Sequence, residues 1–411
     1  MEITTAIKKE NANIPGFDGI RGIYSLLILI THLHFTIFII PFTLAYTSMH
    51  GFFIMSAFLI SRSLIYEKNK SLKFSTYFKI FYIKRSLRIF PVYFAYILVI
   101  VLIMLLTYGT PYKQLLGITY ELKNFGWMLL TFTYNLKDLV CLYTGKNFIA
   151  SYAFPHLWSL SLEEQFYFII PFLIWFCSIK TLKKITLIVI FSFIVIRIIG
   201  FQWLITHPGF SQFENEKQPY LLAFTIFRAT PFQFDTFFYG LFIVLFDIKN
   251  KKLLQVLFWA SLLLLIVSIA ANGYLIANKL NISFIKSIIN YKFMIYNGQY
   301  IYIDLLVNIF CVSMFYLCFM FSDNYSILSN AFLVFIGKIS YGIYVYQYLI
   351  LVPCLYFFSK FMINTFGLFF GELLTLIIAI GLVIGLSYFS YQAMEIYFIK
   401  KKDKYIAKYK K

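Results

Sequence analysis

The first hydrophobic stretch of the chain carries two polar residues, Arg21 and His32, whose types and spacing could do chemistry. At about 100° per residue, eleven positions are about 20° more than three full helical turns, so both side chains share one helix face. A rise of about 1.5 Å per residue separates them by about 16 Å, roughly half of a hydrocarbon core about 30 Å thick. With Arg21 at one interface, His32 lies near the bilayer midplane. A titratable ring at that depth is costly unless it faces a polar cavity, so a functional role for His32 is the first hypothesis.

A second candidate for chemistry is the segment WSLSLEEQFY, which places Glu163 and Glu164 inside or at the mouth of another hydrophobic stretch. Ser159, Glu163 and Tyr167 are spaced four apart and therefore share a helix face. Carboxylates within a span are rare unless they are paired or line water. We expect Glu163 to orient a histidine, neutralise an arginine or bind a sugar hydroxyl, and a structural ion pair with an arginine is the alternative.

A third candidate is the segment KRSLRIFPVY, where Arg85 and Arg88 are three residues apart and share a helix face. Pro91 is expected to limit or kink that helix. Paired guanidinium groups at a cytoplasmic interface can bind phosphates bidentately. Anchoring to lipid headgroups explains the same pair equally well.

Other polar residues are weaker candidates for lining a cavity. Asp18 precedes Arg21 at the start of the first stretch, and Ser56 is a small residue that permits close helix packing. Arg228 and Asp235 are seven apart on one predicted helix face, too far for a direct pair, so each should meet a partner from another helix. A polar stripe suited to interhelical hydrogen bonds or to a hydroxyl-rich ligand is formed by Ser340, Tyr344 and Gln347.

The elements that must position these residues are membrane-spanning helices. The 411-residue chain is 61% hydrophobic and 13% charged, and apolar segments long enough to cross a bilayer recur along it. The predicted fold is an all-α polytopic membrane protein with about ten transmembrane helices. The predicted spans are 22–41, 46–66, 90–108, 158–177, 185–205, 221–246, 253–275, 301–322, 336–358 and 369–391.

The net charge of +19 gathers in loops that fall on one side of the membrane if these spans alternate. By the positive-inside rule that side is cytoplasmic and holds both termini. The loop 41–51 has no Lys or Arg and is expected outside, whereas 322–330 should be inside yet also lacks a basic residue. These charges favour topogenic anchoring over nucleic-acid binding. The five cysteines show no CxxC and no metal-ligand spacing, so no metal site is expected.

Six segments together resemble the membrane-bound acyltransferase-3 family, whose members O-acylate extracytoplasmic sugars. The resemblance covers nearly the whole chain, with Arg21 and His32 in register with the family's opening Arg-x10-His pattern, and Glu395 at the place of a late acidic residue. The segments, in family order, are FDGIRGIYSLLILITH, GFFIMSAFLI, KRSLRIFPVY, WSLSLEEQFY, FRATPFQFDTFFYG and ISYGIYVYQ.

The resemblance implies an O-acyltransferase of the inner (cytoplasmic) membrane that moves an acyl group, acetyl first, from cytoplasmic acetyl-CoA to a glycan hydroxyl on the far side. His32 would be the catalytic base with Glu163 beside it, and Arg21, Arg85 and Arg88 would bind the donor. Acetyl-CoA would be a co-substrate, with no cofactor bound permanently, and the acceptor a surface polysaccharide such as an O-antigen or a lipid-linked saccharide of the cell envelope. The resemblance also divides the chain into a cytoplasmic segment 1–16, a transmembrane acyltransferase domain 17–395 and a basic cytoplasmic tail 396–411.

One departure from the family is Gln347, which stands where the family usually has a histidine. Glutamine can form hydrogen bonds but cannot titrate. This departure keeps open an inactive relative with a regulatory or assembly role. A flippase or transporter for lipid-linked sugars is a separate alternative, because it would also need charged residues in a cavity. The acceptor sugar, the acyl length and the oligomeric state are not determined by the sequence.

Overall fold

The structure is a computed structural model of the chain, and it describes residues 16–32, 42–70, 72–110, 117–144, 153–206, 225–281, 283–289, 300–319 and 327–409. Over these ranges the chain is helical and contains no strand. By length and composition, six helical runs in these ranges could cross a membrane. The chain is thus a helical membrane protein, as its composition predicts, while the count of ten spans and the sidedness of the termini stay predictions.

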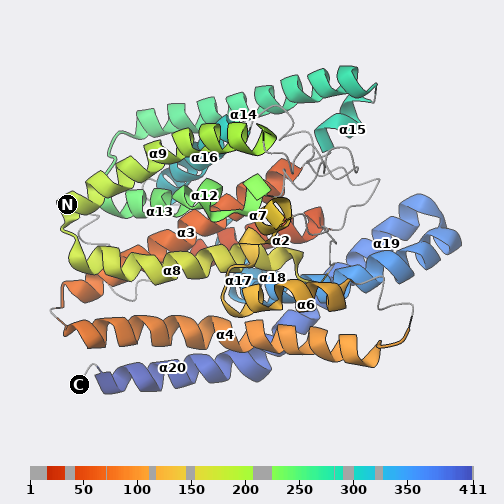
Figure 1. Ribbon diagram of the computed structural model, residues 1–411, viewed down its shortest axis with the longest axis horizontal. Coiled ribbons are helices and arrows are strands. Elements are labelled where there is room, and N and C mark those ends of the chain that lie inside the picture. Colours follow the sequence, from red (N-terminus) through yellow and green to blue (C-terminus); the bar gives the residue numbers. More distant parts are fainter. Residues whose placement is uncertain are drawn as a thin grey trace.

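The helices lie largely side by side in a bundle (Figure 1). The first half contains α2 (Phe17–Thr31), α3 (Phe42–Lys68), α4 (Phe74–Leu106), α6 (Ile118–Leu130), η1 (Tyr134–Leu136), α7 (Lys137–Thr144), η2 (Pro155–Leu157), α8 (Trp158–Phe176) and α9 (Ile179–Thr206). The second half contains α12 (Thr230–Gln233), α13 (Asp235–Leu245), α14 (Lys251–Leu280), α15 (Phe284–Ile289), α16 (Tyr300–Phe319), α17 (Ala331–Lys338), α18 (Ser340–Pro353), η4 (Cys354–Phe358), α19 (Ser359–Ser390), η5 (Tyr391–Glu395) and α20 (Ile396–Tyr409).

Two close helix crossings hold the functional segments in place. A Cβ added at Gly240 of α13 would lie 2.6 Å from the Cβ of Ala57 on α3, so this crossing needs a residue without a side chain. Similarly, a Cβ at Gly337 of α17 would lie 1.8 Å from the backbone oxygen of Asp18 on α2. Small residues at such contacts let helix backbones approach closely in a membrane. The second crossing fixes the start of α2, one turn before Arg21.

Several predicted spans match single helices, and others are corrected. Helix α8 matches the predicted span 158–177, and α3, α9 and α14 cover theirs with longer ends. Helix α4 begins at Phe74, well before the predicted start of this span at residue 90. It also continues through Pro91, so the proline does not end the helix. The second half of the first predicted span, 33–41, lies outside the described residues, as do Lys8 and Lys9.

The predicted continuous span 221–246 is wrong, because the chain is extended at Ala229, before the short helix α12, and turns into α13. Pro231 contributes to this break, because it has no N–H to donate inside a continuous helix and is instead accommodated in the first turn of α12. The predicted span 369–391 covers the part of α19 that follows an interruption at Gly367, where φ is 78°, and ends on the first residue of η5. The predicted tail 396–411 is helical over its described part, α20, which packs along α4.

The Lys-rich connections gather at one end of the bundle. Lys68 donates hydrogen bonds to the backbone oxygens of Ile174 and Cys177, which joins the end of α3 to the end of α8. Lys183, near the start of α9, lies over the ring of Phe246, just after α13. Figure 1 shows the end of α20 at the same end of the molecule. We refer to this as the basic end of the bundle.

Candidate active site

A cavity of about 180 Å³ lies between α2, α3, α4, α8 and α18. One side of its wall is apolar and comes mainly from α3, including Met49, Phe52 and Met55. The polar side combines residues from sequence segments far apart in the chain: Arg21, Ser56, Arg85, Arg88, Ser159, Glu163, Tyr167, Ser340 and Tyr344. Most of the residues singled out from the sequence thus meet at one place. We call this space the inner cavity.

Glu163 lies among the three arginines of the inner cavity. The charges of Arg85, Arg88 and Arg21 all act on its carboxylate. Arg85 is partly buried, with its guanidinium 5.3 Å from the ring centroid of Tyr167, whereas Arg88 is exposed. Among the side chains that line this cavity the arginines outnumber the one carboxylate, while Asp18 pairs with Arg21 and Glu164 acts on Arg85 from outside the lining. Such a cavity favours an anionic ligand or a reaction in which negative charge develops.

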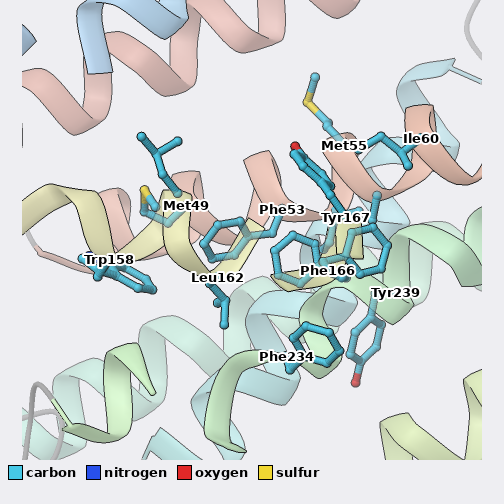
Figure 2. Packing of buried hydrophobic residues seen from close by; sticks show 14 of the residues in the cluster. Met49, Phe53, Met55, Ile60, Trp158, Leu162, Phe166, Tyr167, Phe234 and Tyr239 are labelled. Atoms are coloured by element: carbon cyan, nitrogen blue, oxygen red, sulfur yellow. The ribbon is translucent and has the colours of Figure 1, made fainter. Parts of the chain in front are cut away.

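A chain of hydrogen bonds links the polar wall to α3. Tyr167 donates to Oε2 of Glu163 at 3.1 Å, and its hydroxyl lies 2.7 Å from Oγ of Ser56. Figure 2 shows Tyr167 of α8 beside Met55 of α3, within the apolar packing that also includes Phe53 and Phe166. Ser56 thus takes part in a polar contact between α3 and α8. It holds the Glu163 side chain against the wall of the cavity.

A second cavity, of about 200 Å³, adjoins the first on the side of α17 and α20. Arg21, Arg88 and Tyr341 line both cavities, so these residues stand where the two spaces meet. Its other charged lining residues are Asp18, Lys338, Glu395 and Lys402. Lys402 comes from the Lys-rich α20. We call this second cavity the basic vestibule.

Arg21 and His32 both contact α18, as expected of residues on one face of α2. Arg21 donates to Oγ of Ser340 at 3.2 Å and lies 3.6 Å from the Asp18 carboxylate. His32, the residue after the last of α2, places Nδ1 3.0 Å from Oε1 of Gln347. The two contacts align α2 with the polar stripe of α18. Arg21 reaches the cavities, whereas His32 stands about 16 Å further along α2 and lines neither of them.

His156 was not predicted as a functional residue, and in the structure it lies close to His32. The rings of His156 and Tyr348 are stacked at 4.8 Å, and the Tyr348 ring also lies 5.2 Å from that of His32. Tyr344 connects this group to the inner cavity, because its hydroxyl bonds to the backbone oxygen of His156 and lies 2.5 Å from Oγ of Ser159. The signal available in the sequence was the position of His156, two residues before the WSLSLEEQFY segment and three before Ser159.

Arg228 and Asp235 do not line either cavity. As expected, each meets a partner on another helix: Arg228 lies 3.2 Å from Asp138, and Asp235 lies 2.5 Å from Arg197. The break before α13 means that the two do not share one continuous helix face, which corrects that expectation. Asp235 belongs to a buried polar cluster with Arg197 and Asp304. These contacts favour a structural role for both residues.

Glu164 also lies outside the lining of the inner cavity. Its charge interacts with those of Glu163 and Arg85, and its Oε1 makes no hydrogen bond within the described part of the chain. The stretch holding Glu163 and Glu164 therefore directs one carboxylate into the cavity and the other beside it. Over the same described ranges, no group of three or more His, Cys, Asp or Glu side chains is arranged to hold a metal ion.

The fold and the site define a class of protein: a helical membrane protein whose interior holds arginines, a carboxylate and a hydrogen-bonded histidine. The chain belongs to the acyltransferase domain family, which matches residues 14–392. No solved structure matches the chain.

Two curated relatives show the same kinship. The chain is 28% identical over 185 residues to the peptidoglycan O-acetyltransferase OatA of Listeria monocytogenes serovar 1/2a (strain ATCC BAA-679 / EGD-e), a match that covers 42% of this chain and 27% of the relative. It is 29% identical over 184 residues to a Staphylococcus aureus (strain COL) protein whose name marks its O-acetyltransferase activity as inferred. That match covers 43% of this chain and 27% of the relative. The chain therefore matches about a quarter of the length of these relatives.

Proposed function

We propose that the chain is an O-acyltransferase that moves an acyl group, acetyl first, from cytoplasmic acyl-CoA to a hydroxyl of an extracytoplasmic or lipid-linked glycan. The observation that carries the proposal is the inner cavity, where three arginines surround Glu163. Two of them, Arg21 and Arg88, also line the basic vestibule. Family membership and the O-acetyltransferase names of the relatives support the reaction class. The inner-membrane location, the ten spans and the cytoplasmic termini belong to the same proposal.

The donor enters through the basic vestibule. Arg88, Lys338 and Lys402 supply cations for the phosphates of coenzyme A, and the lysines of the basic end support a cytoplasmic side for this opening by the positive-inside rule. Arg21 stands where vestibule and inner cavity meet, about 16 Å along α2 from His32. The long, narrow pantetheine arm of coenzyme A suits this distance, because its phosphates can stay at the arginines while its thioester extends toward the histidine. Arg85 is less exposed than Arg88 and lies beside Tyr167 in the inner cavity, where it adds a further cation for the donor.

His32 acts as the general base. Its neutral imidazole removes the proton of the acceptor hydroxyl as the hydroxyl oxygen attacks the thioester carbonyl. The tetrahedral intermediate then expels the coenzyme A sulfur, and the imidazolium returns the proton to the thiolate. The C–O bond forms, the C–S bond breaks, and no proton is gained or lost overall.

Two alternatives make different predictions. A transporter of lipid-linked sugars needs a charged cavity but no base at position 32 and no donor. An inactive relative would keep the fold without transferring an acyl group. The hydrogen bond between His32 and Gln347 favours the enzyme, because a histidine held by a defined partner is suited to proton transfer.

Mass analysis of surface glycans tests the proposal in a strain from which the gene is deleted. Complementation with the wild-type chain should restore glycan acetyl groups, and His32→Ala should not. Acetyl groups that survive deletion would refute the acyltransferase proposal. Acetyl groups restored by His32→Ala would leave an enzyme but reject His32 as its base.

A second test separates donor binding from catalysis in membrane vesicles supplied with acetyl-CoA. The double variant Arg85→Ala, Arg88→Ala should raise the KM for acetyl-CoA more than it affects use of the acceptor. Lys79→Ala is the matched control, because Lys79 is an exposed cation on α4 that lines neither cavity. An unchanged donor KM in the double variant would contradict the role of these arginines.

A further inference from the structure

Gln347 is a fully buried amide in the middle of α18, and both ends of its side chain have defined partners. Its Nε2 donates to the backbone oxygen of Tyr344 at 3.0 Å, three residues earlier on the same helix. Its Oε1 lies 3.0 Å from Nδ1 of His32. An amide carries its donor and its acceptor on different atoms, so these two contacts are chemically distinct.

The contact with Tyr344 fixes which way the amide faces. A backbone oxygen only accepts, so the group facing it must be the NH2 of Gln347. The reversed amide would set its oxygen against the Tyr344 oxygen and its NH2 against His32, losing the bond to its own helix. The oxygen of Gln347 is therefore held toward His32.

The orientation of the amide in turn determines the tautomer of His32. Because Oε1 of Gln347 only accepts, Nδ1 of His32 must carry the proton and donate it. In a neutral imidazole one nitrogen is protonated and the other is basic, so Nε2 is the basic nitrogen. We propose that Gln347 is a positioning residue that holds His32 in the Nδ1–H tautomer, with Nε2 as the proton acceptor in acyl transfer.

This inference rests on the proposed role of His32 and gives the departure at position 347 a chemical meaning. A histidine there can accept or donate, so by itself it does not select a tautomer of His32. The anchored amide of Gln347 selects one tautomer and needs no titration of its own. The loss of a titratable group at this position is thus compatible with an active enzyme.

The test measures acetyl transfer from acetyl-CoA by the full chain in membrane vesicles. Gln347→Leu removes the acceptor while keeping an apolar side chain of similar length. We expect its kcat to fall by about 10- to 100-fold, the range found when the outer hydrogen-bond partner of a metal-bound histidine is lost. The KM for acetyl-CoA should stay within about twofold, since the donor-binding arginines are untouched. Gln347→Glu keeps an acceptor oxygen toward His32 but loses the NH2 that donates to Tyr344, so it should recover part of the kcat lost in Gln347→Leu.

Controls separate this role from general packing. Tyr346→Phe removes the 3.0 Å hydrogen bond from α18 to Ser390 of α19 and should leave kcat unchanged. If Gln347→Leu does not accumulate as a monodisperse protein, Gln347→Asn serves instead, because it stays polar but withdraws the oxygen by about 1.5 Å. Its kcat should fall in the same way.

The outcomes distinguish this inference from the proposed function. Full kcat in Gln347→Leu beside an inactive His32→Ala would overturn the role of Gln347 and leave His32 as the base. Equal loss in Gln347→Leu and Gln347→Glu would also overturn it, because the acceptor oxygen would then not matter. A wild-type chain that transfers no acetyl group would overturn both.

Discussion

Replacing Arg197 by methionine should strongly destabilise the protein, because its guanidinium is buried between two carboxylates. Arg197 is 1% exposed, with Nη2 2.5 Å from Asp235 and Nε 2.9 Å from Asp304. Its Nε also donates to the backbone oxygen of Phe232 at 2.8 Å. The arginine joins α9 to α13 and α16 and holds the break before α13.

The magnitude follows from the burial of all three charged groups. Asp235 and Asp304 are fully buried, so removing the cation leaves two carboxylates without it in a medium of low dielectric constant. Breaking one buried ion pair in this way costs about 3–5 kcal/mol. We expect the free energy of unfolding to fall by at least that range in Arg197→Met, since one residue serves both carboxylates.

The measurement is the free energy of unfolding in mixed detergent micelles, followed by tryptophan fluorescence. Lys249→Met is the control, because Lys249 forms an exposed pair at 3.8 Å with Asp247 and should change stability little. Adding Asp235→Asn and Asp304→Asn to Arg197→Met should recover part of the loss, since the uncompensated charges are then removed. A loss below about 1 kcal/mol in Arg197→Met would refute the electrostatic reasoning, as would a triple variant no more stable than the single one.

Three further changes test the site. Gly337→Ala should lower both stability and acetyl transfer, because the new Cβ would lie 1.8 Å from the backbone oxygen of Asp18 and displace α2. Thermal melting and transfer assays measure the effect, and Gly381→Ala is the control because that glycine has open space around it. Tyr167→Phe removes two hydrogen bonds from the inner cavity and should reduce transfer about tenfold with little change in melting temperature, and an unchanged rate would contradict its role. Lys402→Glu should raise the KM for acetyl-CoA several-fold at low salt and less at high salt; a salt-independent effect would remove Lys402 from the donor path.

Much of the site could be predicted from the sequence because a membrane makes polar residues conspicuous. Arg21, Ser56, Arg85, Arg88, Glu163, Tyr167 and Ser340 were singled out as polar side chains in or beside apolar segments, and all of them line the inner cavity. Helical periodicity also placed Arg21 and His32 on one face, and both contact α18. These inferences depend on local spacing and on the cost of polar groups in hydrocarbon, and both are readable from a single chain.

Partners across the bundle could not be predicted in this way. The sequence alone gave Asp235 and Glu163 the same status, yet one pairs with Arg197 in the packed interior and the other faces a cavity. Nor did it identify His156, whose ring joins His32 through Tyr348, a residue 192 positions further along the chain. Such contacts depend on which helices cross and where, and close crossings such as Gly240 against Ala57 determine that.

The sequence by itself determined that this is a helical membrane protein of the acyltransferase domain family, because hydrophobic length, charge asymmetry and motif order are properties of the chain. Only the tertiary structure decided what Gln347 does. Its amide is held by Tyr344 on its own helix and by His32 from a helix more than 300 residues earlier. The direction of a hydrogen bond, and with it the tautomer of a histidine, depends on which atoms meet in space, and residue order alone does not specify that.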